Sequence, residues 1–402
     1  MRAKNFEGGA VEKPNRNTLG FEKAAFFAIV FSHAVNDMSG AFFSSLAPLI
    51  VKEFSLSLTA IGLIMSIRSI AGSMPQPLFG WLSDRFPGRW WLISTPIGVG
   101  IGRTVIGFAA GFWSLAAMLS AGALFSACYH PAAAAMAGTI SAARRGLVVS
   151  IYVASGRLGH ALGPFIALSL VSFFGLKGLL LGMVFYVASA ATLFRYVPHN
   201  ARRKEEVQST EESKSYSRDL WQPMILLYLV MFFRNVATIN LYGFLPLYYS
   251  ARGDTLWEGG TALTLFLVSG ASGGVVGGWL SDRIGRKRVI VFSALTLAPL
   301  LFIFLGTEGF FQYALILLLG VFMHATMGVS VAYAQELMPN RPALAASFMQ
   351  GGNWFVSGLT LTGTGVLGDW LGIEVALKLL AIVLVLEFAI SLTLPAEAKE
   401  TK

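Results

Sequence analysis

The chain has 402 residues, of which 55% are hydrophobic and only 13% are charged, and its mean hydropathy is +0.65. Soluble globular proteins carry about 25% charged residues, so this composition excludes a soluble globule and predicts a protein that crosses the membrane many times. The formal net charge of +9 does not indicate a nucleic-acid-binding surface, because the basic residues lie in short loops between apolar segments.

The first 20 residues mix both charges with Gly, Pro and Asn, and we expect an N-terminal tail at 1–20. The apolar run that follows is too long for a signal peptide and lacks a clear cleavage site, so the first span should remain in the mature protein. The single cysteine, Cys128, excludes an internal disulfide and any metal or redox site built on a pair of cysteines.

Twelve apolar stretches are long enough to cross a hydrocarbon core about 30 Å thick, which requires roughly 20 helical residues. The sequence therefore predicts an all-α membrane protein with twelve transmembrane helices. We expect these helices, spans 1 to 12, near 22–51, 59–82, 90–110, 112–137, 146–173, 177–197, 221–250, 258–281, 288–306, 309–336, 343–370 and 373–394.

Lys and Arg concentrate in alternate loops, on the side of the chain termini. The loops on the opposite side hold only Lys52, Lys177, Arg252 and Lys378. Because cytoplasmic loops carry the excess of basic residues, this asymmetry predicts a multi-pass protein of the inner (plasma) membrane with both termini in the cytoplasm.

Span 1 carries the polar residues that we expect to handle protons. His33, Asn36, Asp37 and Gly40 are spaced i, i+3, i+4 and i+7, so they share one helix face and His33 can reach Asp37. A carboxylate beside an imidazole can exchange a proton as its access to water changes, which makes Asp37 and His33 the candidate proton-coupling pair. The alternative is a static hydrogen bond from Asp37 that ties span 1 to a neighbouring helix.

A hexapeptide after span 2, Gly-Trp-Leu-Ser-Asp-Arg at 80–85, recurs 198 residues later at 278–283. Other landmarks keep the same offset, for example Pro48 and Pro246. Internal repeats that bracket a site at mid-membrane are typical of secondary transporters. The offset predicts two pseudo-symmetric six-helix bundles, at 21–197 and 221–395, joined by a polar cytoplasmic linker at 198–220 and followed by a cytoplasmic tail at 396–402.

The repeated hexapeptide lies on the loops between spans 2 and 3 and between spans 8 and 9, where it resembles the loop motif of the major facilitator superfamily. A narrower resemblance is to the fosmidomycin-resistance-like branch, and Gly159-x-x-x-Gly163-Pro164 also resembles the antiporter signature of span 5. The motifs that carry the narrower resemblance are Ser32-His33-Ala-Val-Asn36-Asp37, Gln76-Pro77-Leu-Phe-Gly80, Tyr129-His130-Pro131, Gly159-His160-Ala-Leu-Gly163-Pro164 and Ala334-Gln335-Glu336. Members of this branch resemble proton-driven exporters of small antibiotics or metabolites.

The hexapeptide also predicts a conformational latch, because glycines permit close helix packing and paired charges at a helix end can hold one conformation. The alternative is a basic loop that serves only topology. The expected latch residues are Gly80, Asp84, Arg85, Gly278, Asp282 and Arg283.

The resemblance implies a central cavity lined by spans 1, 2, 4, 5, 7, 8, 10 and 11, with spans 3, 6, 9 and 12 outside it. It places Arg103 and Glu387 outside the cavity. The ionisable residues that it allows to face the cavity are His33, Asp37, Arg68, His130, Arg157, His160, Arg234 and His324.

Arginine is well suited to binding a carboxylate, phosphate or phosphonate through two hydrogen bonds, so Arg68, Arg157 and Arg234 favour an anionic substrate. By the 198-residue offset, Asn36 and Asp37 correspond to Arg234 and Asn235, which would place an acid and a base at similar depth. The alternatives are an inter-helix salt bridge for Arg234 and neutralisation of Arg68 or Arg157 by Asp37.

Further polar residues complete the expected substrate site, with ordinary inter-helix hydrogen bonding as the alternative for each: His160, His130, Asn36, Asn235, His324 and Asn353. We expect no metal site, because no two His share metal-ligand spacing on one helix and the nearby Arg would repel a cation.

The sequence as a whole predicts a proton-coupled antiporter that exports a small anionic or zwitterionic organic compound. The alternative is a proton-coupled symporter that imports an organic anion, and a metal or metal-chelate transporter comes third. No nucleotide loop, metal cluster or Ser-His-Asp arrangement indicates an enzyme. We expect a monomer in the lipid bilayer whose partners are its small-molecule substrate and protons, with no nucleic acid and no cofactor.

Overall fold

The computed structural model describes residues 16–85, 89–139, 145–197, 221–338 and 342–395. These residues are helical almost throughout and include no strand. The expected linker at 198–220, the tail at 396–402 and most of the tail at 1–20 lie outside the described residues, so the domain boundaries stay a prediction.

The first half of the chain forms spans 1 to 6, several of which are interrupted by a 3₁₀ turn. Its elements are α1 (Arg16–Met38), η1 (Ser39–Ala41), α2 (Phe42–Phe54), α3 (Leu58–Ser73), α4 (Gln76–Arg85), α5 (Trp90–Thr104), η2 (Val105–Phe108), α6 (Phe112–Thr139), α7 (Arg145–Phe174), η4 (Leu176–Gly182) and α8 (Met183–Tyr196).

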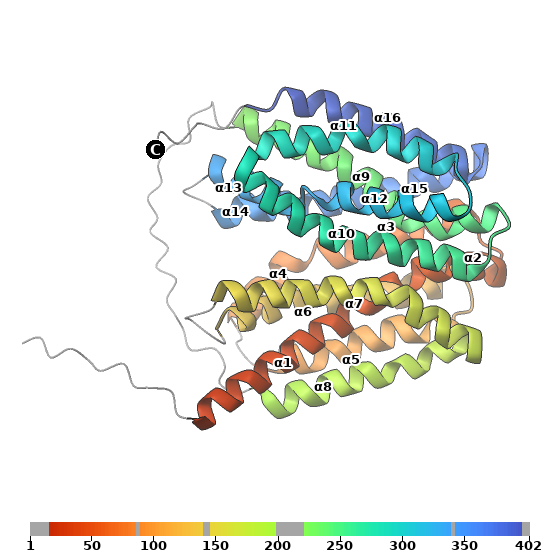
Figure 1. The fold of residues 1–402 in the computed structure, drawn as a ribbon. Coiled ribbons are helices and arrows are strands. Elements are labelled where there is room, and N and C mark those ends of the chain that lie inside the picture. Colours follow the sequence, from red (N-terminus) through yellow and green to blue (C-terminus); the bar gives the residue numbers. More distant parts are fainter. Residues whose placement is uncertain (1–15, 86–88, 140–144, 198–220, 339–341, 396–402) are drawn as a thin grey trace, which may run out of the picture.

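The second half forms spans 7 to 12. Its elements are α9 (Trp221–Ala251), α10 (Leu256–Ile284), α11 (Arg286–Leu305), α12 (Phe310–His324), α13 (Met327–Leu337), α14 (Pro342–Ser347), the π-helical turn η6 (Phe348–Gly352), α15 (Asn353–Leu371) and α16 (Ile373–Leu392). Figure 1 shows the halves as two groups of helices, coloured red to yellow-green and green to blue.

Among the described residues, eleven helical segments are long and apolar enough to cross a membrane. They correspond to the expected spans except span 11, which consists of α14, η6 and α15. Span 11 nevertheless lies among the others, because α15 packs against α3, α9 and α16. The expected all-α architecture with two helical bundles is confirmed.

The internal repeat extends to the way the helices begin. Ser57 caps α3 by accepting a hydrogen bond from the backbone N–H of Ala60. At the same offset of 198 residues, Thr255 caps α10 and forms a capping box with Glu258. Capping side chains satisfy backbone donors that have no partner inside the helix, so span 2 and span 8 start at fixed, equivalent positions.

The two halves meet mainly where α3 crosses α15, where α7 crosses α10 and where α2 lies against α9. Glycines allow these close crossings. A Cβ atom at Gly62 would lie 2.3 Å from the carbonyl oxygen of Leu361, and one at Gly260 would lie 2.2 Å from Leu168 Cδ1. A side chain at Gly62 would meet backbone and push the halves apart, whereas one at Gly260 would first displace the side chain of Leu168.

One group of hydrogen bonds between the halves lies near one face of the molecule, here termed the far face, where α2 ends and α3 begins. The side chain of Asp369, at the end of α15, accepts hydrogen bonds from the backbone N–H groups of Leu58 and Thr59 at 2.9 Å each and from Thr59 Oγ1 at 2.6 Å. Trp257 Nε1 donates to Ser172 Oγ at 3.2 Å. At the opposite, near face, where α1 begins and α16 ends, α4 makes its main contacts with α6 of its own half.

Candidate substrate cavity and proton site

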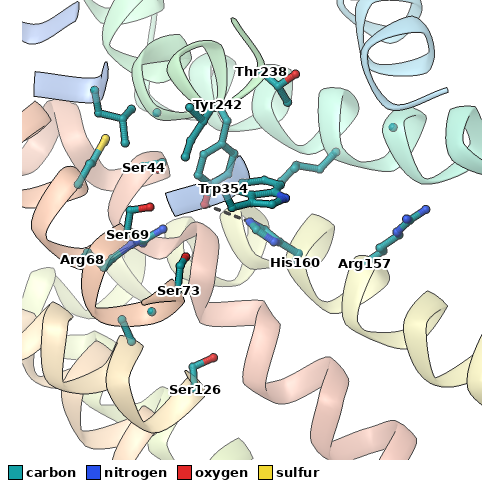
Figure 2. Close-up of a pocket in the computed structure, with 18 of the residues that line it drawn as sticks. Ser44, Arg68, Ser69, Ser73, Ser126, Arg157, His160, Thr238, Tyr242 and Trp354 are labelled. Atoms are coloured by element: carbon teal, nitrogen blue, oxygen red, sulfur yellow. Dashed lines mark hydrogen bonds between the residues drawn. The ribbon is translucent and has the colours of Figure 1, made fainter. Parts of the chain in front are cut away.

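A cavity of about 360 Å³ lies between the halves at the middle of the spans. All eight spans that were expected to line it contribute residues, and Figure 2 shows side chains of both halves projecting into the same space. Span 3 also contributes, through Arg103, which differs from the expectation that this residue lies outside.

Arg103 reaches the cavity because α6 has a glycine, Gly122, where the arginine side chain passes it. A Cβ atom at Gly122 would lie 2.9 Å from Arg103 Cγ, so only a glycine leaves room for the arginine to pass. Arg103 Nη1 donates to the carbonyl oxygen of Asn36 at 2.9 Å and to Ser39 Oγ at 3.1 Å. The buried guanidinium therefore holds the end of α1 and the 3₁₀ turn η1 in place.

Arg157 differs from the other arginines of the spans. Its half-buried side chain lines the cavity and extends from α7 to the second half, where a Cβ atom at Gly274 would lie 2.7 Å from Arg157 Nη1. Within the described part of the chain, its guanidinium forms no hydrogen bond and no ion pair with another side chain or the backbone. Five N–H donors thus point into or beside the cavity without a protein acceptor.

Arg68 and Tyr242 both donate to the carbonyl oxygen of Gly40 in η1. Arg68 Nη1 donates to this oxygen at 2.9 Å, and the hydroxyl group of Tyr242 in α9 donates to it at 2.8 Å. Because the hydroxyl proton of Tyr242 is donated to Gly40, the hydroxyl oxygen can accept a hydrogen bond from His160 Nε2 at 3.0 Å. Figure 2 shows this contact as a dashed line. The three side chains join both halves at the wall of the cavity.

The expected contact between His33 and Asp37 is present. His33 Nε2 lies 3.3 Å from Asp37 Oδ2, and His130 Nε2, from α6, lies 3.6 Å from Asp37 Oδ1. Gly156 of α7 makes room for the pair, since a Cβ atom there would lie 2.4 Å from His33 Cε1 and 2.5 Å from Asp37 Oδ2. His33 is buried, whereas His130 lines the cavity, so the cluster connects the interior of the first half with the cavity.

The tautomer of His33 follows from its other contact. His33 Nδ1 lies 2.7 Å from the carbonyl oxygen of Tyr152, which can only accept, so Nδ1 carries a proton. In a neutral imidazole, Nε2 then presents a lone pair to the carboxylate of Asp37. Two lone pairs at 3.3 Å repel each other, so an additional proton on either His33 or Asp37 would make this contact favourable.

His33, Asp37 and His130 also offer one ligand atom each within 4.8 Å of one another, close enough for a metal ion. The prediction of no metal site was based on the absence of two suitably spaced His on one helix. In this cluster, however, one His lies on α1 and the other on α6. Arg103 lies beside it, bonded to the backbone of Asn36. A proton in this cluster is repelled less strongly by the guanidinium of Arg103 than a divalent cation would be. The cluster therefore favours a proton.

Arg234 does not face the cavity. It is completely buried and pairs with Glu387 of α16, with Nε 2.7 Å and Nη2 2.5 Å from Oε1. Its Nη1 donates to Ser293 Oγ at 2.8 Å and to Thr326 Oγ1 at 2.5 Å. This arrangement differs from the expected anion ligand and corresponds to the inter-helix salt bridge that was its alternative.

The expected asparagine ligands are also used within the protein. Asn235 Nδ2 donates to Asn353 Oδ1 at 2.8 Å, which joins α9 to α15, and both residues are buried. Asn36 Nδ2 lies 2.9 Å from Ser126 Oγ and from Asp37 Oδ1. Of the remaining expected residues, His324 lines the cavity, with Nδ1 2.9 Å from the carbonyl oxygen of Gly320.

The repeated hexapeptide lies at the near face in both halves. Gly80 and the exposed Arg85 belong to α4, and the side chain of Asp84 lies outside the described residues. In the second half, Asp282 pairs with Arg286, whose Nε donates to Glu336 Oε1 of α13 at 3.1 Å, and Arg283 lies over the ring of Trp279. Gly278 lies on the same helix, α10. These contacts tie α10 to α13 within one half, and the role of the motif as a latch stays a prediction.

Comparison with known proteins gives a consistent result. The family model described as the Major Facilitator Superfamily matches residues 29–263 and 255–402. The fosmidomycin resistance protein of Escherichia coli (strain K12) is 28% identical over 363 residues, which cover 88% of each chain. A probable sulfoacetate transporter of Cupriavidus necator is 28% identical over 65% of this chain and 64% of its own.

Among solved structures, the chain is similar to a bacterial homologue of the human lysosomal transporter Spinster in an inward-facing and occupied conformation. The TM-score is 0.81 at 14% identity, and the match covers 95% of this chain and 97% of the other. At this identity the likeness concerns the fold alone.

Proposed function

Because the chain belongs to the major facilitator superfamily, whose members are transporters and not enzymes, we propose that it is a proton-coupled antiporter that exports a small zwitterionic or anionic organic compound. One observation carries the proposal: the cavity that is lined by the unpaired guanidinium of Arg157 is also lined by His130, which contacts the Asp37 and His33 pair. A charged substrate in this cavity and a proton on the Asp37 and His33 pair can therefore interact electrostatically.

The proton part of the proposal rests on the lone pairs of His33 Nε2 and Asp37 Oδ2, which face each other at 3.3 Å. This geometry is favourable only while a proton lies on one of them. Release of the proton leaves a negative charge on Asp37. A cationic group of the substrate can then take the place of the proton beside this carboxylate. Water reaches the pair past His130, whose side chain is 33% exposed.

The substrate part rests on the balance of charge. Arg68, Arg103 and Arg157 line the cavity, and its lining among the described residues includes no carboxylate, although Asp37 contacts the lining residue His130. A surplus of guanidinium groups favours an acidic group on the substrate, because Arg binds carboxylates and phosphonates with paired hydrogen bonds. The similarity to a probable sulfoacetate transporter supports an anionic substrate.

The sign of the coupling follows from the same charges. A zwitterion that places its acidic group near Arg157 and its cationic group near Asp37 competes with the proton, and competition for one site is what antiport requires. A simple anion behaves in the opposite way, since protonation of Asp37 removes a repulsive charge and strengthens its binding. That case favours symport, which is the second candidate function.

The direction and orientation are proposals of the same kind. The positive-inside rule places the near face, with both termini, in the cytoplasm of the inner membrane, and the bonds at the far face then close the periplasmic side. The similarity to a fosmidomycin resistance protein supports export. We also propose that the protein works as a monomer, with no cofactor and no nucleic acid as partner.

The experiment that tests the function uses purified protein in liposomes that contain a pH-sensitive dye. Counterflow with a panel of carboxylates, phosphonates and amino-acid-like zwitterions identifies a transported compound. For an antiporter, addition of that compound on one side should drive protons in the opposite direction, and binding in detergent should weaken as the pH falls. Proton movement in the same direction as the substrate would replace antiport by symport, and transport without proton movement would refute both.

A further inference from the structure

The two halves contribute different chemistry to the cavity. Every charged residue of the cavity wall in the described part of the chain comes from the first half: Arg68, Arg103 and Arg157. The second half contributes mainly apolar and aromatic side chains to the wall, among them Phe266, Leu267, Met327, Trp354 and Leu361. The cavity is therefore polar and positive on one wall and apolar on the other.

The second half contributes no charged residue to the described cavity wall because its buried arginine forms an ion pair away from the cavity. Arg234 is bonded to Glu387, Ser293 and Thr326 in its own half and is fully buried. Asn235 and Asn353 are bonded to each other. Arg234, Asn235 and Asn353 are thus absent from the cavity lining, whereas Trp354, the neighbour of Asn353, points into the cavity (Figure 2).

We infer that the transported compound is amphipathic: the first half binds its acidic group, and the second half binds an apolar or aromatic group of the same molecule. This inference rests on the proposed function in one respect, which is that the cavity is the substrate site. A cavity of about 360 Å³ is at the lower end of the range for small-molecule pockets, so the apolar group has the size of a short alkyl chain or a single ring.

The physical consequence is a dependence of affinity on apolar size at constant charge. Each methylene group that leaves water improves binding by about fourfold, until the cavity is full. An inorganic anion, which has no apolar part, gains nothing from the second half. Binding by Arg157 and its neighbours alone would show no such dependence.

The test measures binding of a series of n-alkylphosphonates, from methyl to hexyl, and of benzylphosphonate to the purified full-length protein by isothermal titration calorimetry. Inorganic phosphate is the reference without an apolar group, and the corresponding neutral alkylamides are the reference without charge. We expect the dissociation constant to fall roughly three- to fourfold per methylene over the shorter members, and the amides to bind at least tenfold more weakly than the phosphonates.

Two variants separate the walls. Trp354→Ala should flatten the dependence of affinity on chain length, whereas Arg157→Gln should weaken the binding of all phosphonates by a similar factor and keep that dependence. Trp370→Ala is the matched control, because Trp370 lies on the same helix, α15, but is 80% exposed on the outer surface. If Trp354→Ala unfolds, Trp354→Leu and Leu361→Ala test the same wall.

The outcomes distinguish the inference from the proposed function. Equal affinity for phosphate and all alkylphosphonates in the unmodified protein, or an unchanged chain-length dependence in Trp354→Ala, would overturn the amphipathic substrate and leave an anion transporter. Amides that bind as well as the phosphonates would overturn the proposed anionic substrate as well.

Discussion

Arg157 and Arg234 are both arginines inside apolar spans, yet the structure uses them differently. Arg234 is fully buried in an ion pair with Glu387, and Arg157 lines the cavity with no partner among the described residues. An ion pair that loses one member leaves a buried charge uncompensated, whereas an unpaired arginine at a cavity can be replaced without that penalty. The two residues should therefore respond to substitution in opposite ways.

We expect Arg234→Met to lower the free energy of unfolding by about 3–5 kcal/mol, because Glu387 remains buried without its partner. The double change Arg234→Met with Glu387→Leu should recover much of this loss. Arg157→Met, the matched control, should leave thermal unfolding in detergent nearly unchanged and reduce substrate binding. Normal stability of Arg234→Met would show that Glu387 finds a proton or another partner at little cost.

Asp37→Asn should abolish proton-driven accumulation of substrate and retain part of the exchange of labelled for unlabelled substrate. The amide can still donate a hydrogen bond to His33 Nε2, so the cluster keeps its shape, but it cannot take up or release a proton. Accumulation and counterflow in the same liposomes measure the two activities, with His324→Gln as a control in the cavity but outside the cluster. A variant that still concentrates substrate would remove Asp37 from the coupling mechanism.

At the scale of helices, sequence reasoning succeeded where the determinants are local. The face shared by His33 and Asp37 follows from helical spacing, and their contact is confirmed. The partners of Arg234 and Arg103 could not be deduced, because Glu387 lies 153 residues away and the route of Arg103 depends on Gly122 of another helix. Spacing within one helix carries no information about which neighbouring helix completes a pair.

The contact of Asp369 with the first residues of α3 was not predicted, since nothing local marks an aspartate at a helix end as the cap of a distant helix. Its side chain accepts from the backbone of Leu58 and Thr59 across the two halves. A carboxylate at a helix N-terminus stabilises the helix dipole and satisfies free N–H groups. Separation of the halves at the far face has to break these bonds.

Asp369→Asn should therefore shift the population away from the state that is closed at the far face. Caps contribute about 0.5–2 kcal/mol, and for this exposed carboxylate we expect the low end, about a two- to fivefold shift. Spin-label distances between Phe173→Cys and Phe310→Cys, in a Cys128→Ala background, measure it. Glu374→Gln is the control, because Glu374 pairs with Lys378 of its own helix. Identical distance distributions in Asp369→Asn and the parent would show that the cap does not hold the far face closed.

At the scale of the whole molecule, the 198-residue offset predicted the equivalence of the halves, and the caps at Ser57 and Thr255 extend it. The offset did not predict the difference in charge between the halves. Asn36 and Asp37 correspond to Arg234 and Asn235, but the first pair contacts Ser126 and His130 of the cavity wall, whereas Arg234 pairs with Glu387. A repeat fixes where helices lie, and unequal partners decide what each half presents to the substrate.

Because only one wall of the cavity carries positive charge, we also expect transport to be sensitive to the membrane potential. In the proposed transport cycle, three guanidinium groups and the carboxylate of Asp37 move through part of the bilayer's electric field as the halves rock, and moving one elementary charge through 100 mV changes the free energy by about 2.3 kcal/mol. A potential that is negative in the cytoplasm favours an empty cavity that faces the cytoplasm, and an anionic group that neutralises the cavity removes part of this preference. For the proposed antiporter, the return of the substrate-free, proton-loaded carrier is then the electrogenic step, so the rate of transport in liposomes should change when the potential is set by potassium and valinomycin at constant pH and substrate concentration.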